Sequence, residues 1–410
     1  MWINQFMNSG SLSDNPGRHE LLFLCICSGF ATCVFSMASP LIPLHLVHLQ
    51  IPPGLIGIII SFSTVGSLLL AVPGGFLINT WGSRLMMQRA GILYTAACVV
   101  ITVFPGFKGL AAGLFFLEIG KLLFFLGAQS HVGSLGEGRD LNSDFGWYGT
   151  AGALGQMAGP AIAGGLIDSV GHRLTWAVIS LSMALIIFVF PVRLYSGKIN
   201  TADNTGADGN RKKKGIRELV SVYAFIAILA SFAVLFADGA RLTFYPVMLK
   251  QFGYTATVIG VYMSLRALTS VSVRFYMPAI VKKAGGRFPA LIISIFILAA
   301  GIGSTPFCEG HFLLLINSVF VGIGLGLALP LSMATVSEGL KPEDRGVAMG
   351  IRLTGNRLAQ LINPLFFGII AQVYSLGAAF ISGGFLLFAA VLPILIWWRG
   401  EKTKTGFTGS

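Results

Sequence analysis

Apolar residues occupy this chain in long continuous runs that short polar connections separate. Twelve of the runs are long enough to cross a bilayer, because about 20 apolar residues in a helix span the hydrocarbon core. They lie near residues 21–43, 54–78, 88–105, 110–134, 145–167, 174–194, 219–247, 256–280, 288–305, 312–335, 346–371 and 377–398. Barrel strands would alternate polar and apolar positions over about ten residues. We therefore expect an all-α membrane protein with twelve transmembrane helices.

The second half of the chain repeats the first. The stretch Gly146 to Asp168 matches the stretch 204 positions further on, Gly350 to Gln372. Its identical pairs are Gly146/Gly350, Thr150/Thr354, Leu154/Leu358, Gln156/Gln360, Pro160/Pro364 and Gly164/Gly368. An offset of 203 pairs Pro43/Pro246, Ile56-Gly57/Ile259-Gly260, Gly82/Gly285 and Arg84/Arg287. The duplication predicts two pseudo-symmetric bundles of six helices each.

Polar segments divide the chain around these bundles. The segment between the halves is rich in Gly, Asn, Asp and Thr and ends on the basic run Arg211 to Lys214, as a flexible linker does. The expected parts are an N-terminal arm 1–20, a bundle 21–195, a linker 196–217, a bundle 218–398 and a tail 399–410.

Composition and charge place the protein in a membrane. Of 410 residues, 54% are hydrophobic and only 11% are charged, unlike soluble domains. The net charge of +12 does not indicate nucleic-acid binding, because most Lys and Arg lie in the even-numbered connections and at the termini. The positive-inside rule then predicts that both termini are cytoplasmic. We expect a multi-pass protein that works as a monomer in a bacterial plasma membrane. We interpret the five cysteines as small packing residues. We expect no metal and no cofactor.

Two motifs stand out: Gly75-x-x-x-Asn79-x-x-Gly82-x-Arg84 between the second and third helices, and Gly155-x-x-x-Gly159-Pro160 on the fifth. Together with the helix order, they resemble the major facilitator superfamily over essentially the whole chain. Gly75 to Arg84, between the second and third helices, is similar to the family's G-x-x-x-D-x-x-G-R element, with Asn79 in place of Asp. The fifth helix carries Gly155-x-x-x-Gly159-Pro160-x-x-Ala163-Gly164, which resembles the motif of proton-coupled drug and metabolite exporters. The helix-four arginine of exporters has no counterpart, because Leu123 holds its position. The resemblance implies a transporter that works by alternating access.

Small residues and proline in these motifs are candidates for gating. Glycines let helices approach closely, and Pro160 bends its helix, so tight packing and a sliding interface are both open. The candidate gating and interface residues are Gly155, Gly159, Pro160, Gly164, Asn79, Arg84 and Arg352. His45 and His48, near the outer end of the first helix, are expected to anchor it at the interface or to sense protons.

Seven charged residues lie at membrane depth in the predicted helices: Glu118, Lys121, Asp238, Arg241, Arg266, Arg352 and Arg357. A charge at membrane depth costs at least about 2.5 kcal/mol, so each needs a partner, a watery cavity or a function. Glu118/Lys121 and Asp238/Arg241 are spaced i, i+3 and can pair. Glu118 is the first candidate for proton coupling and Asp238 the second, with Lys121 as charge partner.

The remaining arginines and the repeated glutamines are candidates for substrate binding. Arg266 and Arg357 lie near mid-membrane without an acid on their own helices, and a guanidinium grips a carboxylate or phosphate at two points. The alternative is an ion pair with Glu118 or Asp238. Gln156 and Gln360 are expected to line a shared cavity or to bond a neighbouring helix. The candidate substrate-binding residues are Arg266, Arg357, Gln156, Gln360 and Arg241.

Together these patterns predict a secondary transporter, not an enzyme, that exports a small anionic or amphipathic molecule in exchange for protons. A proton-coupled importer of an organic anion is one alternative. A receptor or scaffold that does not transport, built on a transporter fold, is the other. The expected partners are the substrate, protons and the lipid bilayer.

Overall fold

The computed structural model describes residues 16–135, 141–189, 222–338 and 345–405, and they are almost entirely helical. The expected linker 196–217 lies outside the described residues. The described helices are α2 (Pro16–His48), α3 (Pro53–Val103), α4 (Phe107–Gly133), α5 (Leu141–Val189), α7 (Val222–Thr243), α8 (Tyr245–Gln251), α9 (Ala256–Phe275), α10 (Met277–Lys283), α11 (Arg287–Ser304), α12 (His311–Glu338), α13 (Arg345–Val373) and α14 (Leu376–Thr405). Helix thus reaches into the ranges expected for the arm and the tail.

The described helices account for most of the twelve expected membrane crossings. Among the described residues, nine helical segments are long and apolar enough to cross a membrane, and the bent pair α7 and α8 makes a tenth. α5 in addition contains two helices that meet at the Gly171 kink. The predicted all-α membrane fold is confirmed.

Glycines reverse the chain where one long helix contains two crossings. Gly82 in α3 has φ 75° and Gly171 in α5 has φ 81°, in the left-handed region that side chains with a Cβ avoid. Gly285, the repeat equivalent of Gly82, also has φ 81°. The duplicated sequence therefore builds the same turn in both halves.

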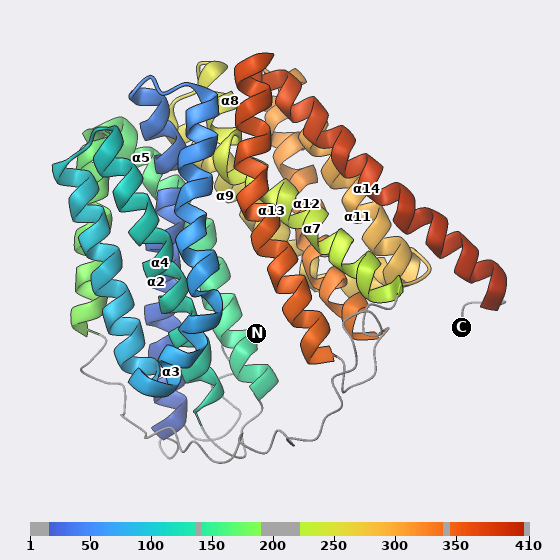
Figure 1. Ribbon diagram of the computed structural model, residues 1–410, viewed down its shortest axis with the longest axis horizontal. Coiled ribbons are helices and arrows are strands. Elements are labelled where there is room, and N and C mark those ends of the chain that lie inside the picture. Colours follow the sequence, from blue (N-terminus) through green and yellow to red (C-terminus); the bar gives the residue numbers. More distant parts are fainter. Residues whose placement is uncertain (1–15, 136–140, 190–221, 339–344, 406–410) are drawn as a thin grey trace.

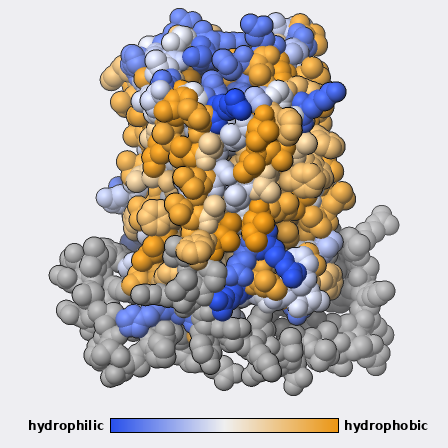
Figure 2. All heavy atoms as spheres, turned by 90° about the vertical axis from the view of Figure 1, so that its left-hand side faces the viewer, coloured by the Kyte–Doolittle hydropathy of each residue, from blue (hydrophilic) through white to orange (hydrophobic). Residues whose placement is uncertain are grey.

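The helices form two bundles (Figure 1). In the first bundle, α2 packs against α5 and α3 packs against α4; in the second, α11 packs against α12 and α14, and α13 packs against α7. Large apolar side chains cover the outside, for example Phe188 at 77% exposed and Phe385 at 72%. Figure 2 shows a hydrophobic band below the hydrophilic upper end of the molecule. Such a surface suits contact with lipid chains.

Two seams join the bundles, one between α5 and α9 and one between α3 and α13. Glycines bring backbones into direct contact there: a Cβ on Gly164 would lie 2.2 Å from the Ala256 carbonyl oxygen, and a Cβ on Gly260 would lie 2.2 Å from the Pro160 oxygen. In the other seam a Cβ on Gly57 would lie 2.2 Å from the Pro364 oxygen. Gly57 and Gly260 are repeat equivalents, as are Pro160 and Pro364. The seams are thus two copies of one contact.

Hydrogen bonds reinforce both seams. In the α5–α9 seam the Ala161 N–H donates to Ser264 Oγ at 3.1 Å. In the α3–α13 seam the Ser61 hydroxyl donates to the Leu361 carbonyl oxygen at 2.8 Å, and the Gly54 N–H donates to Gln372 Oε1 at 3.3 Å. We call the end of the molecule that holds these contacts and the turns 49–52 and 252–255 the sealed end. The bundles diverge toward the opposite end (Figure 1).

Asp168 closes the sealed end with a helix cap. Its carboxylate accepts hydrogen bonds from the Ala256 N–H at 3.1 Å, the Thr257 N–H at 2.7 Å and the Thr257 hydroxyl at 2.6 Å. These N–H groups belong to the first turn of α9, where backbone donors lack partners within the helix. A residue of the first bundle therefore caps a helix of the second.

Candidate functional site

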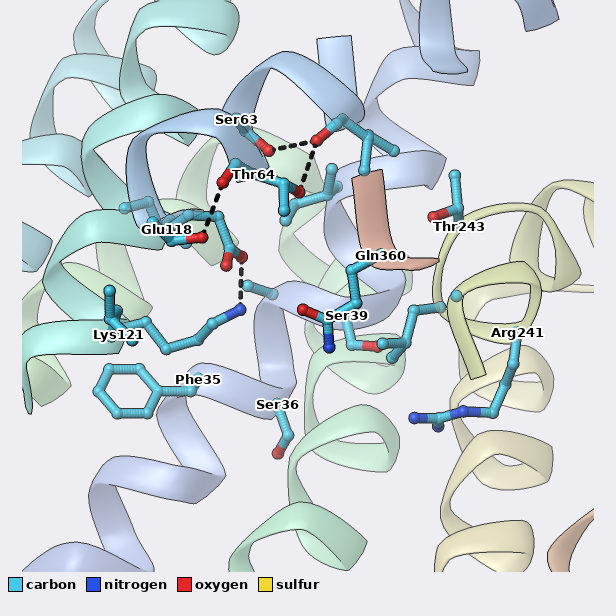
Figure 3. Close-up of a pocket in the computed structure, with 18 of the residues that line it drawn as sticks. Phe35, Ser36, Ser39, Ser63, Thr64, Glu118, Lys121, Arg241, Thr243 and Gln360 are labelled. Carbon is cyan, nitrogen blue, oxygen red and sulfur yellow. Dashed lines mark hydrogen bonds and ion pairs between the residues drawn. The ribbon is translucent and has the colours of Figure 1, made fainter. Parts of the chain in front are cut away.

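A cavity of about 490 Å³ lies between the two bundles, next to the seams. Its volume is within the range of small-molecule sites. Seven helices supply its walls, and Figure 3 shows side chains from both bundles facing a common space. The polar and charged side chains that line it are Thr32, Ser36, Ser39, Ser63, Thr64, Ser67, Glu118, Lys121, Gln129, Gln156, Arg241, Thr243, Arg357 and Gln360.

The wall from the first bundle carries an ion pair. Lys121 Nζ contacts Glu118 Oε1, one turn apart on α4, as the i, i+3 spacing predicts. Both side chains remain partly exposed, at 34% for Lys121 and 19% for Glu118. Figure 3 shows the pair on the opposite side of the cavity from Arg241. The carboxylate therefore faces the space that a substrate would occupy.

The wall from the second bundle carries two guanidinium groups. The Arg241 Nε donates to Asp238 Oδ1 on the same helix, and the Arg357 Nη1 donates to Gln360 Oε1 at 3.1 Å. A guanidinium has five N–H donors, so one such bond leaves most of them for a ligand. Three cations and one carboxylate line the cavity in total, so its field favours an anion.

The repeated glutamines meet at the cavity. Gln156 on α5 and Gln360 on α13 both line it, each one turn before a proline of its helix. Pro160 and Pro364 line it as well. The pseudo-symmetry read from the sequence therefore relates the two sides of one cavity.

Hydroxyl groups of α3 line the cavity and were not among the predicted residues. Ser63 and Ser67 donate to carbonyls of their own helix, those of Ile60 and Thr64, at 2.7 and 2.8 Å. Their oxygens keep lone pairs for a ligand or water. The spacing of Ser63, Thr64 and Ser67 on one helical face is the sequence signal that identifies them.

Arg266 and Arg352 lie outside this cavity. Arg266 is 3% exposed, and its Nη2 donates to the Met263 carbonyl oxygen of its own helix at 3.4 Å. Arg352 is 1% exposed and donates from Nε to Ser231 Oγ at 2.7 Å. Asp238 pairs with Arg241 and is not among the lining residues.

The helix-five motif divides between two neighbours. Gly155 and Gly159 pack against α2 of their own bundle, where added Cβ atoms would lie 2.2 Å from the Gly29 oxygen and 1.9 Å from Ser36 Oγ. Pro160 and Gly164 instead contact α9 of the other bundle. Only the second half of the motif therefore lies where the bundles meet.

The remaining candidates lie at the two ends of the first bundle. Asn79 is exposed and Arg84 half-buried, on either side of the Gly82 turn. At the sealed end the rings of His45 and His48 stack on His172, with centroid distances of 5.4 and 4.7 Å. The Trp176 Nε1 donates to His45 Nδ1 at 3.0 Å. His45 is thus packed inside the bundle, and His172 is a partner that the sequence analysis did not find.

Comparisons with known proteins agree with this architecture. The family model described as Major Facilitator Superfamily matches residues 24–308 and 227–409. An uncharacterized MFS-type transporter of Enterobacter sp. (strain 638) is 20% identical over 92% of this chain and 95% of its own length. The multi-drug resistance efflux pump PmrA of Streptococcus pneumoniae is 26% identical over 39% of this chain and 42% of its own.

A solved structure shows the same fold. The bacterial homolog of the human lysosomal transporter Spinster, in an inward-facing and unoccupied conformation, superimposes with a TM-score of 0.74 at 14% identity, over 94% of this chain and 96% of that one. Members of the matched family are membrane transporters and not enzymes, as the sequence analysis expects. The chain belongs to the Major Facilitator Superfamily.

Proposed function

We propose that this secondary transporter binds a small organic anion in the cavity between its bundles and exports it in exchange for protons. The observation that carries the proposal is the presence of Arg241 and Arg357 in the second-bundle wall of a cavity whose first-bundle wall carries Glu118. Guanidinium groups bind carboxylates and phosphates in a bidentate manner. The apolar lining, which includes Phe35 and Phe125, suits an amphipathic body on such an anion.

The basic connections support an orientation with both termini in the cytoplasm of a bacterial cell. The sealed end then faces the exterior, and the conformation is inward-open. An exporter loads its substrate in this conformation. Rocking of the bundles about the cavity opens the seams at the sealed end and releases the substrate outside.

Glu118 supports proton coupling because it shares the cavity with the substrate. A proton on Glu118 changes the charge that a bound anion meets in the cavity, so proton binding and anion binding are linked at this site. The partial similarity to the efflux pump PmrA supports export as the direction. Asp238 is the second candidate for the coupling site, through its pairing with Arg241.

Transport by purified protein in oriented liposomes tests the substrate site. We expect counterflow of an organic anion from a panel of carboxylates and phosphates, reduced at least tenfold in Arg357→Gln. Arg173→Gln is the matched control, because Arg173 is exposed at the sealed end and bonds the Thr102 carbonyl oxygen. If the wild type transports only cations, or if Arg357→Gln transports normally, the proposal that this cavity binds an organic anion is wrong.

Replacement of Glu118 by Gln tests the coupling. We expect Glu118→Gln to keep counterflow, which needs no net proton movement, and to lose transport driven by a pH gradient. Glu309→Gln is the control, since Glu309 is exposed and lies outside the cavity. Normal pH-driven transport in Glu118→Gln would show that another residue is the coupling site. Accumulation in the direction opposite to export would identify an importer.

A further inference from the structure

A second, much smaller cavity lies inside the second bundle. The space open to the centre of a water-sized particle in it is about 10 Å³, so the cavity holds one small particle. Side chains from α7, α8, α9, α11, α12 and α14 and the turn at Thr305 enclose it: Arg241, Tyr245, Arg266, Ile302, Thr305, Asn317, Ser318, Val321 and Phe380. Arg241 also lines the large cavity, so the two spaces share one guanidinium.

Arg266 is the most unusual member of this wall. Its side chain is buried at 3% exposure, and its one hydrogen bond within the described part of the chain goes to a carbonyl oxygen of its own helix at 3.4 Å. No carboxylate of the described residues forms a salt bridge with it. A buried charge needs a counter-charge or it is strongly destabilising. Its burial without a salt bridge therefore makes Arg266 a group that an anion would stabilise.

The carboxylate that acts on Arg266 already accepts a hydrogen bond from another guanidinium. Asp238 interacts with Arg266 electrostatically, but its Oδ1 accepts the hydrogen bond of Arg241 Nε. The two guanidiniums and the single carboxylate leave one positive charge uncompensated in the membrane interior. A small anion between Arg241 and Arg266 would balance it.

The other polar groups of the wall supply a further donor. Tyr245 Oη and Ser318 Oγ share one hydrogen bond at 3.0 Å, and two hydroxyls hold two protons, so one proton remains for a ligand. The Asn317 amide nitrogen is used by the Gly301 oxygen at 2.7 Å, and its Oδ1 has no partner in the described structure. That unpaired acceptor favours a water molecule. A test must therefore distinguish a bound anion from a bound water molecule.

We propose that the small cavity binds one halide-sized anion, chloride under physiological conditions, between the guanidinium groups of Arg241 and Arg266. A hydroxyl of the Tyr245–Ser318 pair completes the site. The apolar residues Ile302, Val321 and Phe380 exclude water from the remaining directions and strengthen the electrostatic attraction. Binding of the halide stands independently of the export function proposed above.

Halide-dependent thermal unfolding of the purified protein is the first test. At constant ionic strength, we expect chloride or bromide to raise the unfolding temperature saturably, and gluconate, which is too large for the cavity, to leave it unchanged. Arg266→Gln should weaken halide binding at least tenfold. Arg352→Gln is the matched control, because Arg352 is equally buried in the same bundle but bonds Ser231 outside this cavity. It should keep the halide response.

A crystallographic measurement keeps the proposal testable if Arg266→Gln does not fold. Wild-type crystals grown in bromide should show one anomalous scattering peak between Arg241 and Arg266. Absence of the peak, or density of a water molecule there, would overturn the proposal. A wild type whose stability is equal in chloride and gluconate would overturn it as well, as would an unchanged halide response in Arg266→Gln.

Discussion

At the scale of single residues, the Asp168 carboxylate is the contact whose loss should be easiest to measure. It caps α9 from the opposite bundle through three hydrogen bonds. Removal of a cap costs about 1 kcal/mol, so we expect Asp168→Ala to weaken the sealed conformation by about that amount. The measurement is a double-mutant cycle with Thr257→Val, read from the fraction of protein with a closed sealed end.

Two neighbouring changes control this prediction. Asp168→Asn keeps one acceptor oxygen and should lose less than Asp168→Ala. Ser169→Ala removes an exposed hydroxyl that bonds only its own helix, at Gly165 and Leu166, and should change nothing. A coupling of zero between positions 168 and 257 would show that the cap does not hold the bundles together.

Residue-scale chemistry was only partly predictable from the sequence. Arg266 and Arg357 lie at a similar depth along their helices, so counting from the helix ends could not separate them. The structure places Arg357 in the large cavity and Arg266 in the small one. Depth follows from helix length, whereas the direction that a side chain faces depends on which helices pack around it. Gln156 and Gln360 could be predicted because the repeat relates their surroundings as well as their positions.

At the scale of helices, the close contacts of the α5–α9 seam predict that a larger side chain at position 164 forces the two helices apart. A Cβ on Gly164 would meet the Ala256 carbonyl oxygen at 2.2 Å, whereas a Cβ on Gly165 would meet nothing within 4 Å. Overpacking costs about 1 to 3 kcal/mol, so Gly164→Val should destabilise the sealed conformation by that amount and favour opening at this end. Gly165→Val, at the next position, is the matched control.

Thiol labelling measures this opening. A cysteine at Gln360, which lines the large cavity, should react faster with an impermeant reagent added from the sealed side in Gly164→Val than in the parent. The parent carries Cys33→Ser, because Cys33 is half-buried while the other four cysteines are buried. Equal labelling in Gly164→Val and Gly165→Val would mean that the seam tolerates the larger residue without opening.

The helices and their pairing could be predicted from the sequence more completely than the contacts of the helix-five motif. Apolar runs gave the crossings, and the two offsets matched Gly57 with Gly260 and Pro160 with Pro364, which the structure shows in equivalent seams. The spacing of Gly155, Gly159 and Gly164 predicted close packing but not the neighbours. The glycines of α5 contact α2 first and α9 further along, because α5 packs against both helices. This arrangement depends on the whole fold.

At the scale of the whole molecule, the two seams lie on different helix pairs and yet close the same end. If each bundle moves as a rigid body, a wedge in one seam must also open the other, because the packed helices of a bundle do not deform independently. We therefore expect Gly164→Val, in the α5–α9 seam, to expose Ser61 in the α3–α13 seam. Ser61 is 4% exposed and bonds the Leu361 oxygen across that seam at 2.8 Å.

Labelling of Ser61→Cys from the sealed side distinguishes rigid-body motion from local opening. Under rigid-body rocking, Gly164→Val should increase the labelling rate of Ser61→Cys by a factor similar to that for Gln360→Cys, and Gly165→Val should leave both rates at the parent level. The far seam shares no side chain with position 164, so a local distortion around the valine cannot reach it. Faster labelling at Gln360→Cys alone would therefore show that the seams open separately, and alternating access in this protein would then proceed by bending of α5 at Pro160 rather than by rocking of whole bundles.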